Sequence, residues 1–151
     1  MGLFDDLTVK INNILHSKGD NKNKLKAVSD LLNVNVDYYN WVGFYMMDKT
    51  GKNLILIVFN GEPTEHTQIQ VGKGICGQAA ETKKTFIVQD VSRESNYLSC
   101  SIKVKSEIVI PILKDDKVVG ELDIDSHKVA PFTLDDRNFL ENICQMVSEI
   151  L

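Results

Sequence analysis

The fold is decided by residues 106–126, which read SEIVIPILKDDKVVGELDIDS. Two apolar runs, Ser106–Leu113 and Val118–Ile124, flank the polar residues 114–117. Apolar runs of this length, separated by turn-forming residues, are typical of two antiparallel strands joined as a hairpin. We therefore expect a hairpin in the second half of the chain.

A second hairpin is predicted upstream. Residues 41–47 are apolar and rich in aromatic side chains, residues 48–52 have turn chemistry, and residues 53–59 form another apolar run. Shorter elements are expected between the hairpins: a short stretch around Ile69 and Val71, a helix over 74–83 and a strand over 85–88. Residues 90–100 read as irregular or weakly helical.

Helices are predicted at both ends of the chain. Apolar residues recur at helical spacing over the first 17 residues, and Asp20 is a good start signal for a second helix. Near the C-terminus, Thr133 and Asp136 resemble a capping box ahead of another apolar stripe. Helices outside and hairpins in the middle predict an α+β domain, with a central antiparallel sheet of about six strands flanked by helices. We expect one domain over 1–151, without repeat or linker.

Composition and charge exclude several classes of function. The net charge of −4 argues against nucleic-acid binding, which needs a basic face. No apolar segment approaches the about 20 residues needed to cross a bilayer, and the N-terminus has no secretory pattern. We therefore expect a cytoplasmic protein without a membrane partner. In that compartment an odd set of three cysteines is not a disulfide framework.

The cysteines differ in their surroundings. Cys76 lies between glycines at the start of the predicted 74–83 helix, where a helix N-terminus favours a thiolate. Cys100 lies in a polar stretch just before the strand that begins at Ser106. Cys144 falls on the apolar stripe of the last helix, as expected for a buried cysteine that acts as a small hydrophobe. Cys76 and Cys100 together indicate a thiol redox site, although inert cysteines are an equal alternative.

Two other kinds of site receive less support. Gly72, Gly74 and Gly77 match the spacing of a dinucleotide fingerprint, but that motif requires a parallel βαβ unit and the flanking hairpins predict an antiparallel sheet. No close pair such as C-x-x-C is present, so no metal site is expected. The three histidines are isolated and are expected at the surface.

Acidic residues complete the candidate site. Asp123 and Asp125 alternate along a strand and therefore share one side of it, while Leu122 and Ile124 occupy the other. The two carboxyls are either exposed to solvent or line a pocket that binds an ammonium group or keeps one carboxyl protonated. Glu107, on the neighbouring strand, is in position to join them.

Several of these segments together resemble the free methionine-(R)-sulfoxide reductases, which are single-domain members of the GAF superfamily. The similar motifs are Trp41–Tyr45, Gly72–Gly77, Ser106–Pro111 and Gly120–Ser126, and they occur in the same order. The resemblance runs from about residue 40 to the C-terminus. It implies a GAF-like fold and reduction of free methionine (R)-sulfoxide, with no cofactor.

The resemblance also implies roles for individual residues. Cys100 corresponds to the nucleophile and Cys76 to the cysteine of the glycine loop, which would form a disulfide that a thioredoxin-like reductant reopens. Trp41 and Tyr45 correspond to the wall around the substrate's methyl group. The remaining roles belong to carboxyl groups. Glu107 or Asp125 would donate the proton, and Asp123 would bind the substrate ammonium.

The sequence departs from the family upstream of the glycine loop. Reductases of the family usually have a further cysteine there, where this chain has residues 63–67, which read PTEHT. A stand-alone GAF domain that binds or senses a small molecule without chemistry is therefore the alternative. A homodimer is possible in either case.

Overall fold

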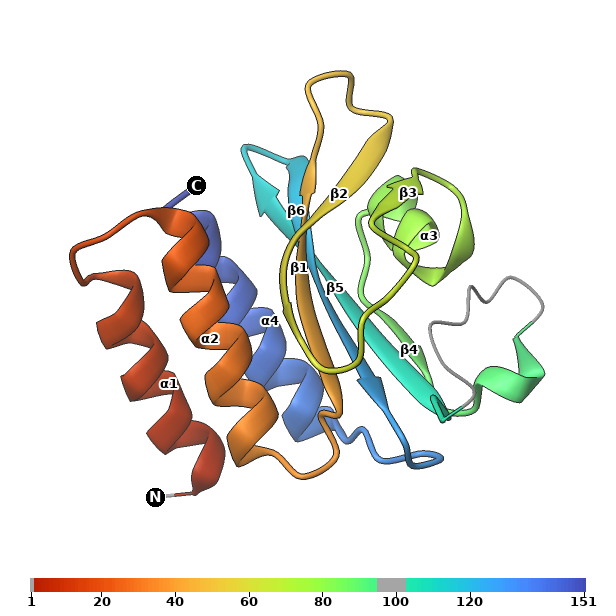
Figure 1. Ribbon diagram of the computed structural model, residues 1–151, viewed down its shortest axis with the longest axis horizontal. Coiled ribbons are helices and arrows are strands. Elements are labelled where there is room, and N and C mark those ends of the chain that lie inside the picture. The colour runs from red at the N-terminus through yellow and green to blue at the C-terminus, as the bar shows by residue number, and fades with distance from the viewer. Residues whose placement is uncertain (1, 95–102) are drawn as a thin grey trace.

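The computed structural model describes residues 2–94 and 103–151, and its centre is an antiparallel sheet (Figure 1). The hairpin of β5 (Ser106–Lys114) and β6 (Lys117–Ser126) pairs through β6 with β1 (Trp41–Met47). β1 continues to β2 (Asn53–Asn60) and the short β3 (Gln68–Gln70), and β4 (Phe86–Val88) pairs with β5. The six strands are ordered β3-β2-β1-β6-β5-β4, as an antiparallel α+β fold requires.

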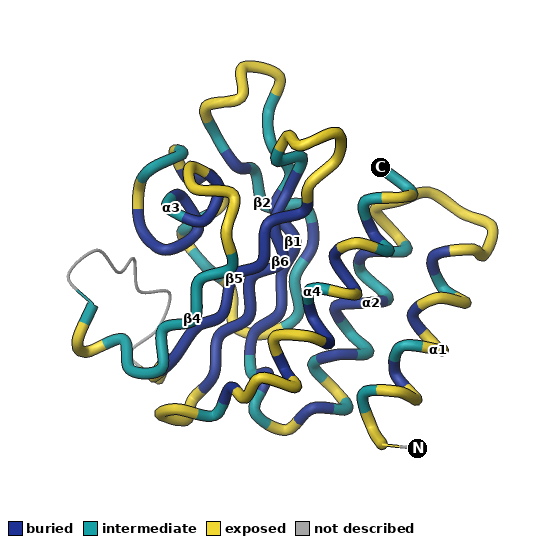
Figure 2. Tube along the Cα trace, turned by 180° about the vertical axis from the view of Figure 1, so that it is seen from behind, coloured by how far each residue is buried: buried dark blue, intermediate teal, exposed yellow. Residues whose placement is uncertain are grey.

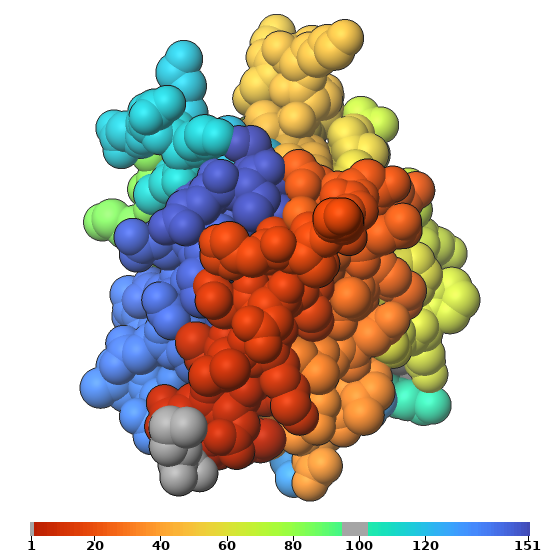
Figure 3. Space-filling model, turned by 90° about the vertical axis from the view of Figure 1, so that its left-hand side faces the viewer, coloured from red at the N-terminus to blue at the C-terminus, as the bar shows by residue number. Residues whose placement is uncertain are grey.

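Three helices cover one face of this sheet. They are α1 (Leu3–Leu15), α2 (Asn21–Asn35) and α4 (Leu134–Ser148). Figure 3 shows them as a continuous layer, past which the tips of the β1–β2 and β5–β6 hairpins project. The short α3 (Gly74–Thr82) lies on the opposite face, beside β3 (Figure 1).

Local capping explains where two of the helices begin. The Asp20 side chain accepts a hydrogen bond from the backbone N–H of Asn23 and starts α2. Thr133 and Asp136 form a reciprocal capping box at the start of α4. Along the length of both α2 and α4, apolar side chains at helical spacing pack onto the sheet.

The two faces of the sheet bury different side chains. On the helix side, the strands and the three helices form a continuous hydrophobic core. The strands contribute Val42 and Phe44 of β1, Leu122 and Ile124 of β6, and Ile108, Ile110 and Ile112 of β5. On the α3 side a smaller cluster includes Trp41, Tyr45 and Cys76. The central strands are buried along most of their length (Figure 2).

The predicted elements agree with the structure to within one to three residues at each end. Both hairpins, both predicted caps and the short elements between the hairpins are confirmed. A 3₁₀ turn over Val91–Arg93 lies in the segment expected to be irregular or weakly helical. Among the helices of the described ranges, none is long and apolar enough to cross a membrane.

Candidate functional site

The candidate site is built on the α3 face of the central strands. Because side chains alternate along a strand, Glu121, Asp123 and Asp125 of β6 all point to this face. Antiparallel pairing then sets Tyr45 opposite Glu121 and Trp41 opposite Asp125. On β5, Glu107 pairs with Asp125 of β6. The buried carboxyl groups of this face are therefore those of Glu107, Glu121, Asp123 and Asp125.

A glycine loop delivers Cys76 to these carboxyls. Gly72 and Gly74 adopt positive φ angles of 93° and 63°, a conformation that glycine adopts without steric cost. The loop turns the chain from β3 into α3, so that Cys76 lies in the first turn of the helix, as predicted. The glycines thus serve a tight turn rather than a dinucleotide, since the sheet around them is antiparallel.

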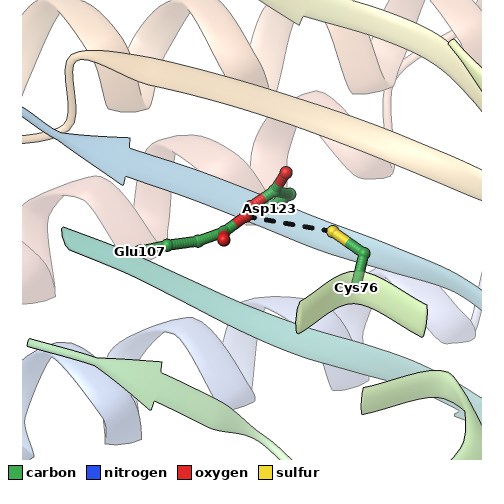
Figure 4. Close-up of side chains that lie close together, drawn as sticks. All are labelled: Cys76, Glu107 and Asp123. Atoms are coloured by element: carbon green, nitrogen blue, oxygen red, sulfur yellow. Dashed lines mark hydrogen bonds between the residues drawn. The ribbon is translucent and has the colours of Figure 1, made fainter. Parts of the chain in front are cut away.

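Cys76 faces the carboxyl groups of two strands (Figure 4). Its Sγ lies 3.9 Å from Oε2 of Glu107, to which the thiol donates a weak hydrogen bond. One ligand atom from each of Cys76, Glu107 and Asp123 falls within 4.8 Å of the others, and all three residues are buried. The structure therefore brings a thiol and two carboxyls together from three separate elements.

A small cavity of about 10 Å³ lies beside this group. Its lining combines the polar residues with apolar side chains of β3 and α3, and consists of Tyr45, His66, Ile69, Ile75, Cys76, Glu107 and Asp123. The expectation that all three histidines are surface residues is wrong for His66, which is half-buried and lines this cavity. The hydroxyl of Tyr45 donates a hydrogen bond of 2.7 Å to the carbonyl of His66, which fixes the loop over the cavity.

The electrostatics of Cys76 contradict one prediction. Burial raises the pKa of the Cys76 thiol well above its ordinary value, and the charges of Asp123, Glu107, Glu121 and Asp125 raise it further. A helix N-terminus favours a thiolate by only about 0.3–1 kcal/mol at an exposed site, which is less than desolvation and four carboxyls oppose. Cys76 is therefore a protonated thiol, and not the stabilised thiolate that its position at the helix start suggested.

Burial also favours the neutral forms of the three carboxyls on β6. Burial raises the pKa of Glu121 and of Asp125 well above the ordinary values, and the charge of Asp123 adds to both shifts. Burial also raises the pKa of Asp123, while Glu107, Cys76 and His66 favour its ionised form. Of the two readings for Asp123 and Asp125, the solvent-facing one is wrong, since both are nearly fully buried.

Several carboxyl oxygens on this face have no hydrogen-bond partner within the described part of the chain. They are both oxygens of Glu121, both oxygens of Asp125, and Oδ1 of Asp123. Buried polar atoms without a partner cost about 1–3 kcal/mol each and are rare in folded proteins. Such a concentration on one face is typical of a site that binds a polar ligand.

Trp41 borders the carboxyl cluster. Its indole stacks on Phe59 with ring centroids 5.7 Å apart, and its Nε1 donates to the carbonyl of Glu62. The ring lies flat over Gly43, where an added Cβ would come within 2.4 Å of the indole. The side chain of Trp41 is therefore locked in place as a flat apolar wall next to Asp125, its neighbour across β1 and β6.

The other two cysteines have different positions relative to the site. Cys100 lies outside the described residues, and its predicted role stays a prediction. Cys144 is buried on the helix side of the sheet, where its Sγ lies 3.9 Å from the carbonyl oxygen of Ile110. Its predicted place in the hydrophobic core is confirmed.

Sequence reasoning missed two residues of the site. Glu121 was not singled out, although the alternation that pairs Asp123 with Asp125 extends to it. His66 lies in the segment that departs from the family motif, and its distance along the chain from the other residues gave no local signal. The convergence of Cys76, Glu107 and Asp123 was also missed, because the search for metal ligands relied on close pairs in the sequence.

Comparisons with known proteins place the chain in a family. A GAF domain model matches residues 25–151. GAF domain-containing protein A of Dictyostelium discoideum is 35% identical over 144 residues, which are 95% of this chain and 89% of that protein. A protein named free methionine-R-sulfoxide reductase from Saccharomyces cerevisiae is 41% identical over 112 residues, 73% of this chain and 62% of that protein.

A solved structure extends this similarity to three dimensions. The X-ray structure of free methionine-R-sulfoxide reductase from Neisseria meningitidis, in complex with its substrate, superimposes with a TM-score of 0.92. The two chains are 30% identical, and the match covers 98% of this chain and 87% of the Neisseria chain. The chain therefore belongs to the GAF domain family and, within it, resembles the free methionine-R-sulfoxide reductases.

Proposed function

We propose that this protein reduces free methionine (R)-sulfoxide to methionine by thiol chemistry. The observation that carries the proposal is the buried thiol of Cys76, 3.9 Å from Glu107, on a sheet face with three further buried carboxyls. The similarity to proteins named free methionine-R-sulfoxide reductase supports the proposal. The structure of the Neisseria reductase was solved in complex with its substrate. The family resemblance supplies the order of the steps.

In the first step, Cys100 is the nucleophile. Its thiolate attacks the sulfoxide sulfur, and a protonated carboxyl donates a proton to the oxygen as the S–O bond breaks. The oxygen passes to the sulfur of Cys100 as the transient bond between the two sulfurs breaks, so that methionine leaves and Cys100 is left as a sulfenic acid. Asp125 is suited to be the proton donor because burial raises its pKa, and Glu107, its neighbour across β5 and β6, is the other candidate.

In the second step, Cys76 resolves the sulfenic acid. Its sulfur attacks the sulfur of Cys100, the S–O bond of the sulfenic acid breaks, and the proton of the Cys76 thiol leaves with the hydroxyl as water. A buried thiol with a raised pKa is a poor first nucleophile, which supports Cys76 as the resolver. A thioredoxin-like dithiol of the cytoplasm then reduces the Cys76–Cys100 disulfide, and the cycle needs no metal or organic cofactor.

Substrate recognition is assigned to the walls of the site. Trp41 and Tyr45 form the wall around the substrate's methyl group, since both are aromatic, buried and on the same face as the carboxyls. Asp123 binds the substrate ammonium, and its Oδ1 has no hydrogen-bond partner among the residues described, so it is available to do so. Recognition of the ammonium selects the free amino acid over a residue inside a peptide.

The alternative is a GAF domain that binds a small molecule without chemistry. It is favoured by the segment 63–67, where reductases of the family usually have a further cysteine and this chain has His66. The two functions differ in the first turnover. A reductase forms one methionine per chain before any reductant is added, whereas a binding module forms none.

The decisive experiment measures methionine formed by the reduced, metal-free protein from the free R-sulfoxide, first without and then with a dithiol reductant. We expect a stoichiometric first turnover and a Cys76–Cys100 disulfide by peptide mapping. Cys76→Ser should keep the first turnover and lose recycling by thioredoxin. No first turnover in the wild type would overturn the reductase function, and normal recycling of Cys76→Ser would overturn Cys76 as the resolver.

A further inference from the structure

Three side chains of the site also form the geometry of a metal-binding group. Cys76 comes from α3, Glu107 from β5 and Asp123 from β6, so each is held by a different element (Figure 4). The Sγ of Cys76 is 3.9 Å from Oε2 of Glu107, and the three ligand atoms lie within 4.8 Å of one another. None of the three residues is more than 6% exposed.

One oxygen of these ligand groups has no hydrogen-bond partner among the described residues, and its residue lines the cavity. Oδ1 of Asp123 is buried without a hydrogen-bond partner in the described ranges, and Asp123 lines the cavity of about 10 Å³ together with Cys76 and Glu107. A cavity of this size holds about one water-sized atom. The space between the three ligands therefore fits a single ion.

The number of carboxyl groups around this space also favours a cation. Glu121 and Asp125 flank Asp123 on β6 and add two buried carboxyls to the same face. No salt bridge between described residues reaches Glu121, Asp123 or Asp125. A buried group of acidic side chains is stable when its members are protonated, paired or bound to a metal ion.

We propose that Cys76, Glu107 and Asp123 bind one thiophilic divalent cation of the Zn²⁺ class. Zn²⁺ accepts sulfur at about 2.3 Å and carboxylate oxygen at about 2.0–2.2 Å, usually in a tetrahedral arrangement. At these bond lengths the ligand atoms of a tetrahedral ion lie about 3.5 Å apart. The sulfur of Cys76 and Oε2 of Glu107 must therefore approach by a few tenths of an ångström, and the most widely separated pair by up to about 1 Å. Ca²⁺ and Mg²⁺ are excluded as the preferred ions because they select oxygen ligands in larger numbers.

Three protein ligands leave the fourth position of a tetrahedral ion open, as in exchangeable zinc sites. The bound ion would be coordinated by the sulfur of Cys76 and the carboxylate of Asp123 at the same time, so neither group would be available for the reaction. If the proposed reductase function holds, on which this consequence rests, Zn²⁺ is a reversible inhibitor that competes with substrate at Asp123 and blocks resolution at Cys76. The cation is then a regulator of the site and not its cofactor.

The binding test uses the full chain, reduced and stripped of metal, with Co²⁺ as a spectroscopic probe and Zn²⁺ as its competitor. We expect one ion per chain, tetrahedral Co²⁺ absorption, and a thiolate-to-cobalt charge-transfer band. Cys76→Ser should lose this band and at least about tenfold in Zn²⁺ affinity. Cys144→Ser is the matched control, since it also removes a buried thiol, and it should keep both.

Asp123→Asn provides a second variant that leaves every thiol in place. It should keep the charge-transfer band while Zn²⁺ binds at least about tenfold more weakly. The proposal is overturned if the wild type binds no stoichiometric Zn²⁺ or Co²⁺, or if the thiolate band persists in Cys76→Ser.

An activity measurement separates this proposal from the proposed function. Added Zn²⁺ should suppress methionine formation, and a chelator should restore it. If metal-free protein forms no methionine, the reductase function fails while the binding test still decides the metal site. If methionine is formed and Zn²⁺ binds without inhibiting it, the inhibitory role is overturned.

Discussion

The two faces of the central sheet are built from the same strands and have opposite chemistry. On β6, Leu122 and Ile124 enter the hydrophobic core under the helices, while Asp123 and Asp125 point to the α3 face. On β1, Val42 and Phe44 alternate in the same way with Trp41 and Tyr45. Both faces are buried, so burial alone does not distinguish the core from the site.

This contrast between the two faces separates the residues that stabilise the fold from those that form the site. Apolar side chains on the helix face gain free energy from leaving water, at about 25 cal/mol for each Å² buried. Carboxyls on the α3 face lose free energy when they are desolvated, and several of their oxygens find no partner among the described residues. Burial on the helix face therefore stabilises the strands and offsets the cost of desolvating the carboxyls on the α3 face.

The largest change in activity is expected from replacing the proposed nucleophile, Cys100, and the matched control is Cys144 in the helix-side core. Cys100→Ser should abolish methionine formation, because a hydroxyl does not supply a thiolate at neutral pH. Cys144→Ser, which removes a thiol from the helix-side core, should lose some stability and keep its activity. Methionine formation by each folded variant is the measurement, and loss of activity in Cys144→Ser alone would reverse the assignment.

The next prediction compares neighbours on β6 that point to opposite faces. Leu122→Ala should lower the free energy of unfolding by about 2–5 kcal/mol, since Leu122 is fully buried in the hydrophobic core. Asp123→Asn should cause no comparable loss but should impair reduction of the free sulfoxide by removing the partner of its ammonium. Denaturant unfolding and substrate kinetics on both variants test the contrast. Equal losses of stability would contradict the separation of the two faces.

The α3 face should also give the protein a distinctive pH dependence. Glu121 and Asp125 have raised pKa values in the folded state, so the folded chain keeps protons that the unfolded chain releases as the pH rises above about 4. The free energy of unfolding should therefore fall as the pH rises from 5 to 8, by up to about 1.4 kcal/mol per pH unit for each such proton.

Glu121→Gln is the variant that sharpens this pH prediction. It removes a titrating group and keeps the shape of the side chain, so the slope of stability against pH should become shallower. Urea unfolding at several pH values measures the slope. A slope unchanged in the variant would mean that Glu121 is not held protonated in the folded protein.

The smallest effect is expected from one methyl group on the α3 face. Gly43→Ala would place a Cβ 2.4 Å from the indole of Trp41, so the ring must tilt away from its position over β1. We expect the KM for the sulfoxide to rise by up to about tenfold while the fold persists. Gly2→Ala is the control, since an added Cβ there meets nothing within 4 Å. An unchanged KM would show that the position of the Trp41 ring does not affect substrate binding, and would contradict its proposed role in the wall around the methyl group.

The fold could be predicted from the sequence because its signals are local. Hydrophobic periodicity located the helices and both hairpins, and Asp20 and Thr133 marked the starts of α2 and α4. Alternation along β6 also predicted that Asp123 and Asp125 share a face. What the sequence left open was which layer covers that face, since this depends on where α3 packs.

The chemistry of the site depends on contacts between distant segments, and there prediction was weaker. The position of Cys76 at a helix start suggested a thiolate, but the carboxyls that raise its pKa come from β5 and β6. His66 reaches the cavity through a loop after β2, at a position for which no periodic pattern exists. Resemblance to a family, rather than local pattern, indicated Trp41 and Tyr45 as substrate-binding residues, whereas the position of Glu107 on the neighbouring strand was enough to add it to the site.

The lengths of the outer strands have a consequence for how the protein behaves at high concentration. β3 and β4, which form the two edges of the sheet, are three residues long each, while the central strands are seven to ten residues long. An exposed edge of free backbone groups is a template on which another chain can add a strand and begin to aggregate. Here β3 pairs only with Asn53–Ile55 of β2, and β4 pairs only with Glu107–Val109 of β5. Within the described ranges the rest of β2 and of β5 has no strand partner on its outer side, so we expect another copy of the chain to add there rather than along the short edge strands.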